Sequence, residues 1–159
     1  NISIQKCIDG ENPILGNHRC GTCHSCDSAI VGDTIEYRGK TYSLQQMTNC
    51  RTSNGIYLTI CPCLLAYVGE TGRELRVRLT EHKSAIRNER AQAPLVQHFM
   101  EQKHKPEDLK WTILEKIVCP VVRDIVTFRK KREVFWMFTL GTQKYGLNEY
   151  IPWENAIRD

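Results

Sequence analysis

Cysteines are the residues whose spacing most directly indicates chemistry in this chain. Five of its eight cysteines lie in two tight groups, C-x2-C-x2-C at residues 20–26 and C-P-C at residues 61–63. Cysteines this close together are typical of metal ligands, because one turn can aim both thiolates at the same ion. Disulfides are the alternative, since an even number of cysteines is compatible with a secreted protein. The clustering favours metal binding.

A carboxylate interrupts an apolar stripe in the last predicted helix, residues 122–140. At about 100° per residue, four apolar residues fall on the same side as Glu133, namely Val126, Trp136, Met137 and Leu140. Burying a carboxylate is costly unless it is paired or binds a metal. Glu133 is therefore a candidate functional residue, with pairing to Arg129 or a place in a cleft wall as the alternatives.

An earlier predicted helix, residues 73–90, carries two polar residues of interest. Leu75, Leu79, His82 and Ile86 recur at helical spacing, and Arg78 and His82 are i, i+4 neighbours that border the apolar stripe. A phosphate or a proton-transfer site could use such a pair. A helix face turned to solvent would explain the two residues equally well. Their interpretation therefore depends on the context that the rest of the sequence gives.

Two tripeptides supply that context. Gly55-Ile56-Tyr57 is followed by Tyr67-Val68-Gly69, and the chain thereby resembles the GIY-YIG nuclease family. The family pattern continues with an arginine, a histidine, a glutamate and an asparagine, matched in order by Arg78, His82, Glu133 and Asn148. Val68 replaces the isoleucine of the family. Because the interval before Arg78 is slightly long, Arg76 is an alternative for the arginine.

The resemblance implies hydrolysis of a DNA phosphodiester. Tyr57 would be the general base that deprotonates water. A free tyrosine has a pKa near ~10, so its surroundings must lower that value, which we expect Arg78 to do. Arg78 would also contact the scissile phosphate, and Tyr67 would orient the hydrated site.

The resemblance gives roles to three further residues. His82 would assist proton transfer or hold phosphate. Glu133 would bind one divalent cation, Mg²⁺ or Mn²⁺, since hard ions favour carboxylate and water ligands. Asn148 would position Glu133 or the backbone nearby.

A zinc site is predicted inside the nuclease pattern. Cys61 and Cys63 lie between the two tripeptides, and downstream His98 and His104 could complete a tetrahedral structural site. The insertion resembles the nuclease domains of Penelope-like retroelements, whose cysteines fall at this place. The longer strings Asn54-Gly-Ile-Tyr-Leu-Thr-Ile-Cys-Pro-Cys and Tyr67-Val-Gly-Glu-Thr-Gly-Arg resemble the same elements.

A second zinc site is implied by the same resemblance. Related elements carry a similar cysteine group and then a lone cysteine before the first strand, which implies the ligands Cys20, Cys23, Cys26 and Cys50. His18, His24 or Cys7 could replace one of them. Cys119, beside a proline at a strand end, is expected to be a buried thiol. Neither zinc should be catalytic, because four protein ligands leave no open position.

Basic residues gather in and near the first long helix. Those we expect to contact DNA phosphates are Arg73, Arg76, Lys83, Arg87 and Arg90, with a further basic run at residues 129–132. Contacts to the phosphate backbone give little sequence preference. A solvated helix face is the alternative for each residue taken singly.

The elements that must position these residues predict an α+β fold, which the resemblance specifies as a three-stranded antiparallel sheet flanked by helices. Strands are expected at residues 55–60, 65–69 and 111–118, and helices at 73–90, 94–102 and 122–140. Residues 1–50 would form a cysteine-rich zinc-binding extension with a hairpin turning at Arg38-Gly39-Lys40, and residues 51–159 the nuclease domain.

Composition restricts the classes of function. The 159 residues are 41% hydrophobic and 25% charged, which argues against disorder, and the longest apolar run is too short to span a membrane. A net charge of +4 permits a polyanionic partner.

The resemblance implies an endonuclease of a retroelement. It would nick target DNA in the nucleus and leave a 3′-hydroxyl that primes reverse transcription, with element RNA and the reverse transcriptase domain of the same polypeptide as partners. A repair or junction nuclease and a non-catalytic zinc module that docks DNA or protein are the alternatives.

Overall fold

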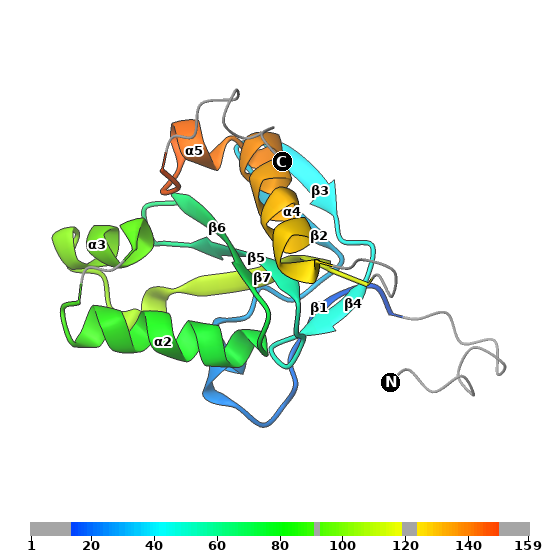
Figure 1. Cartoon of the computed structure of the whole chain (residues 1–159). Helices are drawn as coiled ribbons and strands as arrows, with labels where there is room; N and C mark the ends of the chain where they lie inside the picture. Colours follow the sequence, from blue (N-terminus) through cyan, green and yellow to red (C-terminus); the bar gives the residue numbers. More distant parts are fainter. Residues whose placement is uncertain (1–13, 91–92, 119–123, 150–159) are drawn as a thin grey trace, which may run out of the picture.

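A three-stranded antiparallel sheet lies at the centre of the fold, as predicted (Figure 1). The computed structural model describes residues 14–90, 93–118 and 124–149. The strand order is β6-β5-β7, formed by Ala66–Thr71, Gly55–Ile60 and Lys110–Lys116. With its surrounding helices, the chain has the α+β architecture that the alternation of patterns indicates.

The central strand β5 is buried on both faces. Successive side chains of a strand point to opposite faces, and those of β5 enter two separate hydrophobic clusters. Tyr57 packs on the side of α2 (Leu75–Arg87) and α3 (Pro94–Glu101), whereas Leu58 packs on the side of α4 (Ile125–Leu140). The sheet therefore separates the helix that carries His82 from the helix that carries Glu133.

Helix α2 buries the side that its periodicity predicts, which consists of Leu75, Leu79, His82 and Ile86. It begins two residues later than expected and ends at Arg87 instead of residue 90. Helix α3 begins at Pro94 as predicted, because proline lacks only a donor that the first turn leaves unused. Both helices thus present the faces that the sequence assigns to the core.

Helix α4 begins after Asp124, whose side chain accepts a hydrogen bond of 3.0 Å from the Thr127 amide. It ends at Gly141, which has a φ of +70°. The predicted start at Val122 lies outside the described residues. One part of the expected apolar stripe is wrong, because Val126 is 46% exposed. Periodicity fixes the direction of a side chain, but not how far the sheet extends beneath the helix.

The N-terminal segment contains the predicted hairpin. Strands β2 (Thr34–Tyr37) and β3 (Lys40–Ser43) pair antiparallel. Arg38 and Gly39 between them have φ values of +51° and +73°, as a tight hairpin turn requires. The hairpin packs three side chains into the cluster beneath α4, namely Ile35, Tyr37 and Leu44. The segment before Cys50 and the segment after it therefore share a core.

The remaining elements are short and were not predicted from the sequence. Strands β1 (Gly16–His18) and β4 (Met47–Asn49) pair in parallel. The others are η1 (His24–Ser28), η2 (Pro106–Asp108) and α5 (Thr142–Tyr145). None of the helices in the described ranges has the length and apolar character that a membrane span requires.

Candidate active site and metal centres

Tyr57 is held in β5 opposite a glycine that makes room for its ring. It pairs with Gly69 of β6, where a Cβ atom would lie 2.4 Å from the phenol oxygen. On the other side of β5, a bulge interrupts the pairing with β7 between Ile56 and Tyr57. Bulges redirect side chains and are frequent beside functional sites. The strand thus directs a fully buried tyrosine toward α2.

The Tyr57 hydroxyl and Nε2 of His82 form a hydrogen bond of 2.9 Å, in which the hydroxyl is the donor when the His82 proton is on Nδ1. Burial lowers the pKa of His82 to about 4, so the ring is neutral at pH 7 and can accept this proton. Burial also raises the pKa of Tyr57 above its ordinary value, with Tyr67 adding to the rise and Arg78 opposing it. The expected lowering of the Tyr57 pKa is therefore wrong, because desolvation outweighs the nearby guanidinium.

Arg78 and Tyr67 lie close to this pair. The rings of Tyr67 and His82 meet edge to face with centroids 6.1 Å apart. Burial raises the pKa of Tyr67, while Arg78 acts in the opposite direction on both tyrosines. Arg78 also donates a hydrogen bond of 3.1 Å to Glu81 on the same helix. Two phenols, an imidazole and a guanidinium are therefore gathered beside β5.

Glu133 of α4 is a partly buried carboxylate without a bonded partner. Among the described residues it forms no hydrogen bond and no ion pair. Burial raises its pKa to about 7, and the negative charge of Glu70 adds to this rise. Glu133 in turn raises the pKa values of Tyr57 and Tyr67, which indicates that it lies near both phenols. An unpaired carboxylate at this position is available to a cation.

Arg129 does not pair with Glu133, contrary to the alternative suggested by the sequence. It is 8% exposed and forms an ion pair through Nε with Glu70 on β6. Its Nη1 donates a hydrogen bond of 3.1 Å to Asn54, directly before β5. Because Gly72 has no side chain, the guanidinium fits against the backbone there. No pattern in the sequence indicates that Glu70 is a neighbour of Glu133.

A second carboxylate ties α4 to the opposite edge of the sheet. Glu115 of β7 forms an ion pair with Arg132 at 2.9 Å and accepts a hydrogen bond of 2.8 Å from Trp136 Nε1. Glu70 and Glu115 are both cross-strand partners of Ile56. The two carboxylates therefore lie at matching positions beneath α4. This placement follows from the strand register and not from any pattern in the sequence.

Asn148 binds the backbone of β6 at both ends of its amide. Its Nδ2 donates to the Val68 carbonyl and its Oδ1 accepts from the Val68 amide, each at 2.8 Å. Val68 directly follows Tyr67. Asn148 therefore positions the strand that carries Tyr67, which matches the expected contact with backbone and not a contact with Glu133.

The N-terminal cysteine group comes together as expected. Each of its four cysteines offers a sulfur within 4.8 Å of the others, and these are Cys20, Cys23, Cys26 and Cys50. Hydrogen bonds from Cys50 and Thr22 lower the pKa of Cys20 to about 5, whereas burial raises the pKa of Cys50. The described cysteines form no disulfide. This group could hold a metal ion.

The second group joins the β5–β6 turn to α3. His98 Nε2 lies 3.3 Å from Cys61 Sγ, and His104 Nε2 lies 3.0 Å from Cys63 Sγ. All four donor atoms lie within 4.8 Å of one another. This group could also hold a metal ion, and its ligand set is the one that the sequence predicts. Cys7, an alternative ligand of the N-terminal group, and Cys119, expected to be a buried thiol, lie outside the described residues.

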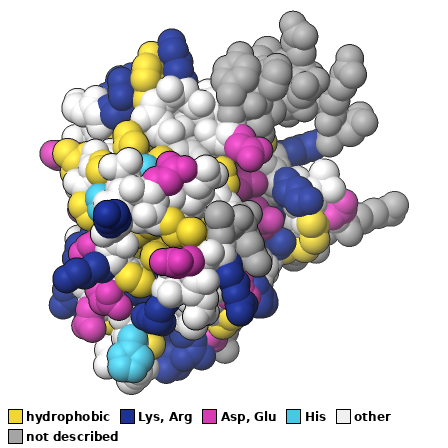
Figure 2. Space-filling model, turned by 90° about the vertical axis from the view of Figure 1, so that its left-hand side faces the viewer, with side chains coloured by type: hydrophobic (Ala, Val, Ile, Leu, Met, Phe, Trp, Pro, Cys, Tyr) yellow, Lys and Arg dark blue, Asp and Glu magenta, His cyan; other side chains and the backbone are white. Residues whose placement is uncertain are grey.

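The basic residues expected to contact DNA mostly have intramolecular partners. Arg73 pairs with Glu81 at 2.6 Å, Arg76 with Glu74, and Arg87 with Glu107 at 3.4 Å. Lys83 donates a hydrogen bond of 3.2 Å to Ser28, and Arg90 follows the end of α2. Figure 2 shows basic and acidic side chains interspersed on the side of the molecule where α3 lies.

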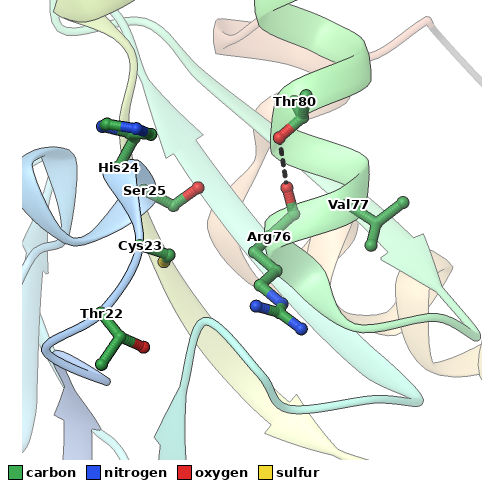
Figure 3. Close-up of a pocket in the computed structure, with 7 residues that line it drawn as sticks. All are labelled: Thr22, Cys23, His24, Ser25, Arg76, Val77 and Thr80. Carbon is green, nitrogen blue, oxygen red and sulfur yellow. Dashed lines mark hydrogen bonds between the residues drawn. The ribbon is translucent and has the colours of Figure 1, made fainter.

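A shallow pocket separates the N-terminal cysteine loop from the first turns of α2 (Figure 3). It is lined by Thr22, Cys23, His24, Ser25, Arg76, Val77 and Thr80. Thr80 donates a hydrogen bond of 2.8 Å to the Arg76 carbonyl. Of the residues expected to be catalytic, only the alternative arginine, Arg76, lines this pocket, which lies on the opposite side of α2 from His82.

Comparisons of the chain with protein-family models, with curated proteins and with solved structures find no match.

Proposed function

We propose that the chain is a metal-dependent DNA endonuclease of GIY-YIG type. One observation carries the proposal: the Tyr57 hydroxyl lies 2.9 Å from Nε2 of a neutral His82, while Arg78 and the unpaired Glu133 lie within electrostatic reach. Hydrolysis of a phosphodiester needs a base for water, positive charge at the phosphate and a means of stabilising the leaving oxygen. These side chains match those needs.

The hydrogen bond supports a proton relay in place of a free phenolate. The Tyr57 oxygen takes a proton from the attacking water while its own proton passes to Nε2 of His82. The hydroxide attacks phosphorus, the bond from phosphorus to the 3′ oxygen breaks, and the leaving 3′ oxygen takes a proton from solvent to become the 3′-hydroxyl. Because His82 is neutral at pH 7, it can accept the proton although Tyr57 itself ionises with difficulty.

Arg78 and Glu133 would hold the other reactants. Arg78 reaches the region of both phenols and would bind the scissile phosphate. Glu133 would hold a hydrated Mg²⁺ or Mn²⁺, since carboxylate and water are the ligands that hard cations prefer. When bound, such an ion would neutralise charge that develops at the phosphate.

The two cysteine-containing groups would hold structural Zn²⁺. Four sulfurs, or two sulfurs and two imidazole nitrogens, are the donor sets typical of closed tetrahedral zinc sites. One zinc would fix the N-terminal loop to the segment before β5. The other would fix the β5–β6 turn to α3, and with it the spacing of Tyr57 and Tyr67.

The resemblance to Penelope-like retroelements supports a biological role. The nick would supply a 3′-hydroxyl in nuclear target DNA, from which an attached reverse transcriptase copies element RNA. A nicked product that DNA polymerase extends without prior phosphatase treatment is the expected result. A product that must first be dephosphorylated would contradict this role.

The test of the proposed function is nicking of supercoiled plasmid with and without added Mg²⁺. We expect Mg²⁺-dependent nicking by the parent and a loss of about 100-fold in Glu133→Gln at unchanged content of bound zinc. Glu101→Gln, an exposed glutamate of α3, is the matched control and should keep the parent rate. DNA binding without nicking by the parent would instead indicate a docking module.

A further inference from the structure

A single carboxylate bridges two arginines at the edge of the candidate active site. One oxygen of Glu81, Oε1, lies 2.6 Å from Nη2 of Arg73, which precedes α2. The other oxygen, Oε2, lies 3.1 Å from Nη1 of Arg78. Glu81 and Arg78 are i, i+3 neighbours, so the helix itself brings them together. The two guanidinium groups thus converge on one small anion.

The bridge adjoins the residues of the proposed reaction. Arg78 is the guanidinium that acts on the pKa values of Tyr57 and Tyr67. The partial burial of Glu81 would raise its pKa, but hydrogen bonds from Arg73 and Arg78 hold that pKa below its ordinary value. The carboxylate is therefore ionised at neutral pH and neutralises part of the charge that Arg78 would offer a substrate.

The bridge is also open to solvent. The side chains of Arg73, Glu81 and Arg78 are 59%, 40% and 33% exposed. Ion pairs with this exposure contribute little stability, so another anion can displace the carboxylate at a small cost in free energy. A phosphodiester presents two anionic oxygens on one atom, as a carboxylate does, and arginine binds both groups through paired N–H donors.

We propose that Arg73 and Arg78 form a two-armed clamp for a DNA phosphate, and that Glu81 occupies the clamp in the free protein and is displaced when DNA binds. The inference rests on the proposed function, because it assigns the phosphate contact of the same site. It adds Arg73 as a second arm and makes Glu81 a residue that limits DNA affinity.

The test is binding of a short fluorescently labelled DNA duplex by the full chain without Mg²⁺, over a series of salt concentrations. Glu81→Gln should bind about tenfold more tightly than the parent, with a steeper dependence of affinity on salt. Glu101→Gln is the matched control: it makes the same change of charge at an exposed glutamate of α3 whose hydrogen-bond partner is Gln97 and not an arginine. It should change affinity by less than about twofold.

A second variant separates the clamp from a general charge effect. Arg73→Gln should weaken binding, and in the double variant the gain from Glu81→Gln should fall to at most about twofold, because one arm is missing. Equal gains in Glu81→Gln and Glu101→Gln would overturn the inference, as would weaker binding by Glu81→Gln. Absence of DNA binding by the parent would instead count against the proposed function itself.

Plasmid nicking by Glu81→Gln distinguishes displacement from positioning. If Glu81 only competes with phosphate, the KM for DNA falls and kcat stays within about twofold of the parent. If Glu81 instead orients Arg78 for catalysis, kcat falls, and the inference is wrong.

Discussion

Gly69 faces Tyr57 across the β5–β6 pairing, and a Cβ atom at Gly69 would lie 2.4 Å from the Tyr57 hydroxyl oxygen. Its absence is what allows the phenol to lie flat against β6 and reach His82 at 2.9 Å. The spacing of the two tripeptides therefore has a geometric meaning. The last residue of the second tripeptide makes space for the last residue of the first.

Replacing Gly69 by alanine should displace the Tyr57 ring and break its hydrogen bond to His82. We expect Gly69→Ala to lose about 100-fold in plasmid nicking and about 2 kcal/mol in the free energy of unfolding, since overpacking forces backbone or rotamer shifts. Gly55→Ala is the matched control, because a Cβ there meets its nearest neighbours at 3.8 Å. Equal losses in the two variants would show that the contact with Tyr57 is not the cause.

Stability should depend on pH through two opposing groups. The pKa of His82 falls from 6.5 to about 4 on folding, so between these values the unfolded chain binds more protons and acid destabilises the fold. The pKa of Glu133 rises from 4.5 to about 7, so over pH 7 to 4.5 the folded chain binds more protons and acid stabilises it. In the parent, the opposite effects of His82 and Glu133 on the pH dependence of stability partly cancel.

Glu133→Gln should reveal the pH dependence of the free energy of unfolding that His82 causes. Between pH 6.5 and 4.5 its free energy of unfolding should fall by roughly 2 kcal/mol more than that of the parent, measured by urea unfolding without added Mg²⁺. Protonation of the cysteine and histidine groups affects both chains equally and cancels in the difference. Parallel pH curves for the two proteins would contradict the assigned shifts.

The sequence predicted the elements better than their contacts. The apolar period of α2 placed His82 on the buried side, and the positions of Cys61 and His98 predicted a group that the fold brings together. Such patterns depend on local spacing, which the backbone geometry of a helix or turn fixes directly. The order and identity of these elements could therefore be predicted.

Contacts that depend on strand register could not be predicted. Glu70 meets Arg129, and Glu115 meets Arg132, only because both carboxylates pair with Ile56 from opposite sides. A shift of one residue would turn them to the other face of the sheet. From the sequence alone, Arg129 is therefore a possible partner of Glu133, although in the structure Arg129 is bound to Glu70.

The Arg129 ion pair should contribute more to stability than the Arg132 ion pair. Arg129→Met leaves the Glu70 carboxylate, whose side chain is 20% exposed, without a partner and should cost about 3 kcal/mol in the free energy of unfolding. Arg132→Met should cost about 1 kcal/mol, because Arg132 is more exposed and Trp136 still binds Glu115. Urea unfolding measures both, and the reverse order would refute the buried network.

Each cysteine-containing group should hold one metal ion of its own. We expect two zinc ions per parent chain by elemental analysis, and one in either Cys26→Ser or Cys61→Ser, with a loss of at least about 3 kcal/mol in stability. Cys119→Ser, at a cysteine that the sequence predicts to be a buried thiol and not a ligand, should keep both ions. Retention of two ions in Cys26→Ser and Cys61→Ser would show that these cysteines are not ligands.

The most direct measurement is the single-turnover rate of DNA cleavage by Tyr57→Phe at saturating protein and Mg²⁺. Phenylalanine keeps the buried ring and removes only the hydroxyl that forms the hydrogen bond with His82. Tyr37→Phe is the matched control, since it removes the hydroxyl of another buried tyrosine outside the site. We predict a loss of at least about 100-fold in Tyr57→Phe, with DNA affinity unchanged and Tyr37→Phe as fast as the parent. Cleavage by Tyr57→Phe at the parent rate would contradict the account.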